Sequence, residues 1–282
     1  MNFQQLTHKD VLKILPDRAR DSHKGDYGRI LLLCGCRGYT GAAALAATGA
    51  LRSGAGLVYL GVPESIYQIV ATKLLEPIVL PLSDVDGHFS CNAVKELCKL
   101  LPKMDAVLIG PGIGQSVETK ALVEAVLTYF EGPVVVDADG INVLKTNTDI
   151  LRGRMYPTVL TPHPGEFARI GGNAGENRQE RAEELARDLN SIIVLKGYGT
   201  VITDGATTYV NPTGNPGMAV GGCGDVLAGM VTAFIGQGVD PLQAAACGAW
   251  LHGAAGDICA EQIGQYAMLP SDLLEFLPRL MK

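Results

Sequence analysis

Asp225 stands where a catalytic carboxylate could act, because it directly follows a run of bare backbone. Four glycines lie within residues 217–224, and the apolar segment VLAGMVTAFIG follows the carboxylate. Amides at a helix start can hold phosphate oxygens, and a carboxylate beside them would stay ionised and accept a proton from an attacking hydroxyl. The alternative is a plain helix start, with Asp225 as an N-cap or first-turn acid. The long glycine-rich stretch from Gly214 favours the anion pocket.

A second motif follows a strand-like apolar run and reads Lys196-Gly197-Tyr198-Gly199-Thr200. A lysine at the end of a strand can reach a phosphate, while glycines let the backbone pass close beneath a nucleotide. The alternative is a tight turn with a solvated lysine. The motif favours nucleotide binding less strongly than the glycine-rich stretch does.

A third motif holds His163 between Pro162 and Pro164, again after an apolar run. Proline fixes the backbone angle φ, so the imidazole is held in place rather than free to move. The alternative is a rigid loop that is capped by Glu166 at a helix start. Both interpretations place His163 at the end of a strand.

Polar and small residues follow two further apolar runs. Asp137, Asp139 and Asn142 come after PVVV and could contact a substrate or a water-bound Mg²⁺, or could simply cap a helix. Ala42 lies in a helix start, Gly41–Ala44, that is small enough for a ligand to pack against its first turn. Such alanines can equally serve a close approach between a helix and a sheet.

The elements that must position these residues alternate between strand and helix. Apolar runs without polar alternation predict buried parallel strands at 29–35, 56–62, 106–112, 133–139, 158–164 and 191–197. Helices are predicted at 41–54, 91–102, 117–130, 176–190, 223–237, 241–262 and 270–281. This alternation predicts a three-layer α/β/α fold with a mostly parallel sheet.

The pattern changes after residue 200, where TVITDGATTYVN predicts an antiparallel edge hairpin with its turn at Asp204-Gly205. No linker or repeat interrupts residues 1–282, so we expect one domain. Ligands of parallel sheets bind beyond the carboxyl ends of the strands, and all the motifs above lie at such ends. We therefore expect one shared site.

The composition excludes several classes of function. Charged residues make up 18% of the chain and the net charge is −6, so no nucleic acid partner is expected. The sequence contains no P-loop and no membrane-spanning run, which predicts a soluble cytoplasmic protein. Seven cysteines without a C-x-x-C pair predict buried, reduced thiols rather than a metal site.

Seven motifs in order resemble the ADP/ATP-dependent NAD(P)H-hydrate dehydratase family of the ribokinase-like superfamily. They are HKGDYGRILLLCG, GAAALAATGALRSGAG, GPGIG, DADGIN, LTPHPGEFARI, VLKGYGTVITDG and NPTGNPGMAVGGCGDVLAGM. The resemblance implies a ribokinase-like fold and a repair enzyme. That enzyme would dehydrate the S-epimer of hydrated NADH or NADPH by phosphorylating its C6 hydroxyl and eliminating phosphate, with ADP (or ATP) and Mg²⁺.

The resemblance also implies roles for individual residues. Ala42, Gly114, His163 and Asp225 would bind the hydrated cofactor, with Asp225 as the base. The adenine nucleotide would be held by Lys196, Gly197, Tyr198, Gly199, Thr200 and Gly224. The residues that would position Mg²⁺ stay unassigned. The chain departs from the family at Cys223, where Thr or Ser is frequent, and at Gly140, where alanine is common.

Partners and alternatives complete the sequence-based expectations. The family is commonly homotetrameric, and the small-faced helices at 41–54 and 242–256 offer packing surfaces. Because about twenty residues precede the first strand, we expect the NAD(P)H-hydrate epimerase of the same pathway to be a separate protein. The alternatives are a ribokinase-like kinase of a vitamin-precursor alcohol, which would release a stable phosphorylated product, and a non-catalytic nucleotide-binding protein.

Overall fold

The chain folds around one large sheet, seen in a computed structural model that describes residues 3–145, 147–173, 175 and 177–282. The described strands of this sheet follow the order β11-β10-β9-β8-β7-β6-β1-β2-β3. Their bounds are β1 Arg29–Leu33, β2 Leu57–Pro63, β3 Ile78–Leu82, β6 Ala106–Ile109, β7 Val134–Val136, β8 Thr158–Leu160, β9 Ile192–Leu195, β10 Val201–Thr203 and β11 Thr208–Val210.

The sheet is parallel from β9 to β3, and β10 pairs antiparallel with both β9 and β11. The predicted parallel sheet and edge hairpin are thus confirmed. The structure adds the edge strand β3, which contains Pro81, and a separate two-stranded hairpin of β4 (Asp84–Val85) and β5 (His88–Phe89). β4 and β5 are too short for an apolar signal, and the proline within the apolar run of β3 argues against a strand there except at a sheet edge.

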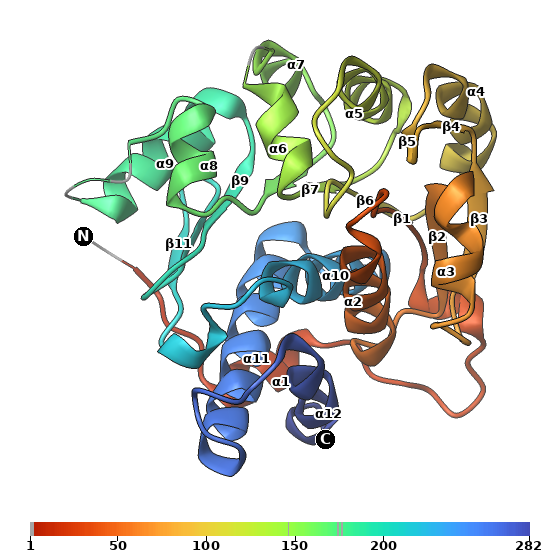
Figure 1. Ribbon diagram of the computed structural model, residues 1–282. Helices are drawn as coiled ribbons and strands as arrows, with labels where there is room; N and C mark the ends of the chain where they lie inside the picture. The colour runs from red at the N-terminus through yellow and green to blue at the C-terminus, as the bar shows by residue number, and fades with distance from the viewer. Residues whose placement is uncertain (1–2, 146, 174, 176) are drawn as a thin grey trace.

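Helices cover both faces of the sheet (Figure 1). One layer contains α4 (Cys91–Leu100), α5 (Val117–Tyr129), α6 (Asp139–Leu144), α7 (Asp149–Arg152), α8 (Pro164–Arg169) and α9 (Arg178–Leu189). The other contains α1 (His8–Ile14), α2 (Thr40–Arg52), α3 (Tyr67–Ala71), α10 (Cys223–Gly236), α11 (Pro241–Gln262) and α12 (Pro270–Leu280). Each predicted helix is present within a few residues of its expected ends; residue 176, the expected start of one, lies outside the described residues.

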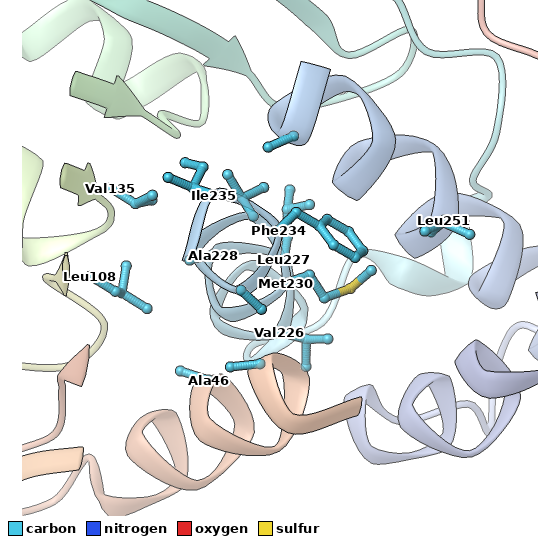
Figure 2. Packing of buried hydrophobic residues seen from close by; sticks show 14 of the residues in the cluster. Ala46, Leu108, Val135, Val226, Leu227, Ala228, Met230, Phe234, Ile235 and Leu251 are labelled. Atoms are coloured by element: carbon cyan, nitrogen blue, oxygen red, sulfur yellow. The ribbon is translucent and has the colours of Figure 1, made fainter. Parts of the chain in front are cut away.

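Helix α10 runs through the core between the sheet and the helices α2 and α11 (Figure 2). A side chain at Gly229 of α10 would lie 2.1 Å from the carbonyl oxygen of Ala46, so only glycine allows this approach of α2 to α10. Ala43, Ala46 and Ala47 of α2 are fully buried. The alanines therefore serve helix–helix packing, and the position of α10 is fixed by the core.

The cysteines differ partly from the expectation. All seven are free, and five are buried, but Cys91 and Cys98 of α4 are exposed. Both lie on a strongly amphipathic helix, on the face that turns toward solvent. Among the residues that the structure describes, no helix is long and apolar enough to cross a membrane.

Candidate active site

The predicted site residues meet at the carboxyl edge of the sheet. The loop after β6 carries Gly114, the loop after β7 carries Asp137, and the loops after β8 and β9 carry His163 and Lys196. These four strands are neighbours in the sheet, so their ends form one continuous row. The expectation of one shared location for the motifs is met.

Asp225 reaches this row from the first turn of α10. Gly222 precedes the helix with φ 105°, and the helix N-terminus has no side-chain cap, so Asp225 is not the N-cap. A side chain at Gly224 would lie 3.3 Å from Nζ of Lys196 and 3.9 Å from Oδ2 of Asp137. First-turn amides have no acceptor within the helix. The start of α10 therefore offers free amides, a lysine and a carboxylate side by side.

A buried polar network holds the lysine. Nζ of Lys196 donates to Oδ1 of Asp137 at 2.8 Å and lies 3.9 Å from Oε2 of Glu166. The hydroxyl of Thr161 donates to the same Asp137 oxygen at 2.6 Å. The Asp137 side chain is 1% exposed and that of Lys196 20%, so the ammonium faces the site while its partner is enclosed. The alternative of a solvated lysine in a turn is wrong.

The electrostatics differ from the expectation that Asp225 stays ionised. Burial, followed by the negative charges of Asp137 and Asp139, raises the pKa of Asp225 to about 7, although Lys196 opposes the shift. Burial acts against the charge on Lys196, but Asp137, Glu166 and Asp225 outweigh it, so the pKa of Lys196 is raised. The helix amides alone do not keep Asp225 charged. A carboxylate with a pKa near neutrality is suited to general-base catalysis at physiological pH.

Asp139 organises the loop after β6. Its carboxylate accepts from the Gly114 amide at 3.0 Å and from Nε2 of Gln115 at 2.9 Å. Ala138, between the two aspartates, has φ +49°, a left-handed conformation that a residue with a side chain seldom adopts. This strained residue turns Asp137 toward Lys196 and Asp139 toward Gly114. Asp139 is the first residue of α6, but the N-cap is Ala138 and no side chain caps this helix, so Asp139 does not have the capping role of the alternative.

Ala42, in α2, lies beside the loop after β6 that carries Gly114. A side chain at Gly112 would lie 2.9 Å from Cβ of Ala42, and one at Gly114 would lie 2.7 Å from Nδ1 of His88. Ala42 is in the first turn of α2, where it is only partly buried. These small residues line the part of the row over β1 and β6, beyond the aspartates.

His163 caps helix α8. Its Nδ1 accepts from the amides of Gly165 and Glu166 at 2.9 and 3.3 Å, while Oε2 of Glu166 accepts from the His163 amide at 2.9 Å. The loop is thus capped, as the structural alternative expected, by the imidazole as well as by Glu166. The side chain is 51% exposed, so it remains open toward a ligand.

The turn at residues 196–200 is held by Arg178, which the sequence analysis did not single out. Its guanidinium donates to the carbonyls of Leu195, Lys196 and Tyr198 at 3.2, 3.0 and 2.8 Å. The hydroxyl of Thr200 donates to the Gly197 carbonyl at 2.9 Å, and Tyr198 is fully exposed. These bonds hold the backbone of residues 196–200 in place and leave Tyr198 open to solvent. We call residues 196–200 the shelf.

The glycine-rich stretch before α10 is tied down by Asp257 of α11. Its carboxylate accepts from the amide of Gly214 at 2.9 Å and from Nδ2 of Asn215 at 3.0 Å. The other site residues were identified because they follow strands or glycine-rich stretches. Neither Asp257 nor Arg178 follows a strand. Both act on segments about 20 to 43 residues away in sequence, so local patterns do not reveal them.

Two departures from the expected motifs have structural consequences. Cys223 is 6% exposed and packs into the core beneath the amides of α10, so its thiol does not face the site. A side chain at Gly140 would lie 2.8 Å from the Ile109 carbonyl oxygen, which leaves no room for alanine without a backbone shift.

The mostly parallel three-layer fold, with a G-x-G-D helix start at the carboxyl edge of its sheet, defines a ribokinase-like protein. A ribokinase-like superfamily protein of Enterococcus faecalis superposes with a TM-score of 0.88 at 27% identity, covering 99% of this chain and 95% of that one. The family model for NAD(P)H-hydrate dehydratase matches residues 30–279. The chain therefore belongs to the NAD(P)H-hydrate dehydratase family.

Two relatives within this family are similar to the chain over its whole length. The ADP-dependent (S)-NAD(P)H-hydrate dehydratase of Bacillus subtilis is 36% identical, over 100% of this chain and 99% of the relative. A crystal structure of the Bacillus subtilis ADP/ATP-dependent NAD(P)H-hydrate dehydratase, co-crystallised with ATP/Mg²⁺, has a TM-score of 0.87 at 35% identity and covers 99% of this chain and 98% of its own. The bifunctional NAD(P)H-hydrate repair enzyme of Moorella thermoacetica is 47% identical over 100% of this chain. This chain spans about half (54%) of that enzyme.

Proposed function

We propose that this chain dehydrates the S-epimer of hydrated NADH and NADPH, with ADP converted to AMP and phosphate. The observation that carries the proposal is the position of Asp225 beside Gly224, Lys196 and Asp137 at an uncapped helix start. Family membership and the name of the Bacillus subtilis relative support the substrate and the donor.

The chemistry follows from the groups at the site. Asp225 takes the proton of the C6 hydroxyl as that oxygen attacks the terminal phosphorus of the nucleotide. The amides of Gly224 and Asp225, with Lys196, stabilise the charge on the transferred group. The ring nitrogen then expels phosphate from C6, and loss of a proton from C5 restores the 5,6 double bond. The net result is loss of water from the hydrate, because ADP ends as AMP and phosphate.

The adenine nucleotide would lie over the shelf at residues 196–200, and the hydrated nicotinamide over Ala42, Gly114 and His163. Mg²⁺ would arrive with the nucleotide, since it is usually bound through one or two carboxylates together with substrate phosphates. In the described part of the chain, no group of three or more His, Cys, Asp or Glu forms a metal cluster. The carboxylates of Asp225 and Asp137 lie at the start of α10, so the donor set fits an ion that is carried by the nucleotide.

Four further proposals concern the protein's pathway, assembly, location and domain organisation. Hydration creates a stereocentre at C6, so an S-specific enzyme requires an epimerase in the same pathway. The assembly is proposed to be a homotetramer of a cytoplasmic protein with a single domain spanning residues 1–282. The small faces of α2 and α11 are buried within one subunit, so they do not supply its interfaces. Light scattering that gave a mass near 29.7 kDa would contradict the tetramer.

Incubation with hydrated NADH, Mg²⁺ and either ADP or ATP tests the function. We expect absorbance of NADH to return only with a nucleotide, faster with ADP than with ATP, and one AMP to form per NADH. Restoration without nucleotide would contradict the mechanism, and a strong ATP preference would contradict only the choice of donor. A vitamin-precursor kinase would instead accumulate a stable phosphorylated alcohol and leave the hydrate unchanged.

A further inference from the structure

The hairpin of β4 and β5 lies against the loops that follow β1 and β6. The amide of Arg37, after β1, donates to the carbonyl of Gly87 in the hairpin turn at 2.9 Å. Asp84 accepts from the Gly87 amide at 3.1 Å and from the Ser65 hydroxyl at 2.6 Å. The turn of the hairpin is therefore bonded to the loop after β1, and its first residue, Asp84, is bonded to Ser65 just before α3.

Two basic residues, Arg37 and His88, border this contact. Gly87 has φ +83°, and a side chain there would lie 2.4 Å from Cβ of Arg37, so the stem of Arg37 lies directly against bare backbone. The next residue, His88, lies against Gly114, with its Nδ1 buried and without a hydrogen-bond partner. Arg37 is exposed.

Neither side chain is neutralised by a neighbour. Among the described residues, no ion pair involves Arg37 or His88. The nearby carboxylate of Asp84 is engaged by Gly87 and Ser65, and that of Asp139 by Gly114 and Gln115. An arginine and a histidine that border the site and have no acidic partner are suited to bind phosphate.

We propose that Arg37 and His88 bind a phosphate group of the hydrated dinucleotide. The proposal rests on the proposed function and adds the residues that recognise the substrate away from the reacting ring. Position in the sheet favours the substrate over the donor. The hairpin contacts the loops after β6 and β1, which lie three and four strands from β9 and Lys196. At about 4.8 Å per strand, this puts the pair roughly 14–19 Å from the proposed nucleotide site, whereas His88 lies against Gly114 on the proposed substrate side.

Kinetics of Arg37→Ala and His88→Ala test the proposal, with NADH hydrate and NADPH hydrate as separate substrates. We expect the KM for the hydrate to rise about tenfold or more in each variant. The KM for ADP should stay within twofold. Arg37→Lys keeps the charge and should recover part of the loss. Arg52→Ala, at the opposite end of α2 and also exposed, is the matched control and should behave as wild type.

The two substrates distinguish two sources of phosphate. An equal rise for both hydrates assigns the pair to the diphosphate, whereas a rise for NADPH hydrate alone assigns it to the 2′-phosphate. Hydrate KM values within twofold of wild type in both variants, or a rise confined to ADP, would overturn the proposal. If wild type does not turn over hydrate, the proposed function fails. Calorimetry then measures the Kd of NADPH, which carries the same phosphates, for wild type, Arg37→Ala and His88→Ala. A Kd that rises about tenfold in both variants supports the proposal, and a Kd within twofold of wild type in both overturns it.

Discussion

Nζ of Lys196 lies 2.8 Å from Oδ1 of Asp137, and both side chains border Gly224 at the start of α10. This ion pair joins the ends of β9 and β7, two strands that are not adjacent in the sheet. It places a positive charge where a nucleotide phosphate would lie and a negative charge beside Asp225. The pair therefore connects nucleotide binding to the basicity of Asp225.

The first prediction concerns this pair. Lys196→Met leaves the Asp137 carboxylate buried with only Thr161 as a donor, and we expect a loss of about 3 kcal/mol in the free energy of unfolding. Denaturant titration measures it. Adding Asp137→Asn removes the unpaired charge, so the cost of Lys196→Met in that background should be smaller by about 1 kcal/mol or more. Lys73→Met, an exposed control, should cost little. Equal costs in both backgrounds would contradict the coupling.

The second prediction concerns the pH dependence of stability. The pKa of Asp225 is raised in the folded protein to about 7 from its ordinary value of 3.8. The folded state therefore binds more protons than the unfolded state between these values, and stability falls as the pH rises through them. Asp225→Asn removes this effect. Because Asp225 is only half-buried, we expect the variant to be more stable than wild type by about 2 kcal/mol above pH 7.

Below about pH 4 the two proteins should be equally stable, since Asp225 is then protonated in both states. Thermal unfolding of wild type and Asp225→Asn between pH 4 and pH 8 measures the difference. A gap that does not change with pH would mean that the pKa of Asp225 is not raised in the folded protein.

The third prediction concerns the pH dependence of the rate. Asp225 must be ionised to accept the hydroxyl proton, so kcat/KM should rise with pH and level off above about 7. In Asp137→Asn one negative neighbour is gone and Lys196 is freed to act on Asp225, so this limb should move to lower pH. A profile that is flat from pH 5 to 8 in wild type would contradict the assignment of Asp225 as the base.

The fourth prediction concerns Arg178. Its guanidinium holds three carbonyls of the 196–200 shelf, and neither methionine nor the single ammonium of lysine can replace that contact. We expect Arg178→Met to raise the KM for ADP about tenfold while the KM for the hydrate changes less than twofold. Arg181→Met, one turn along the same helix, removes only an exposed pair with Glu184 and serves as the control. Equal effects of both variants would contradict a role for Arg178 in the shelf.

Strands were predictable from sequence where an apolar run was long and was followed by charged or glycine residues. PVVV and SIIVL have no polar alternation, so burial on both faces follows, and the charged and glycine residues after them locate the loops. The β4–β5 hairpin was not predictable, because two-residue strands carry no periodicity. His88 was missed for the same reason.

The chemistry of Asp225 was only partly predictable. Its place after a glycine-rich stretch identified it, and the helix amides suggested an ionised carboxylate. Its raised pKa depends first on burial and then on Asp137 and Asp139, which lie about 90 residues earlier and are brought near by the order of the strands. Arg178 is similar, because a charged helix normally faces solvent and only the fold shows that its first residue turns inward.

The most direct test of the account is the rate of NADH restoration from its hydrate by Asp225→Asn at saturating ADP and Mg²⁺. Asparagine keeps the size of the side chain but cannot take the hydroxyl proton, so we expect kcat to fall by about 10²–10⁴. ADP binding should stay within twofold, and the protein should remain folded. An Asp225→Asn variant that kept most of the wild-type kcat would contradict the assignment of Asp225 as the catalytic base.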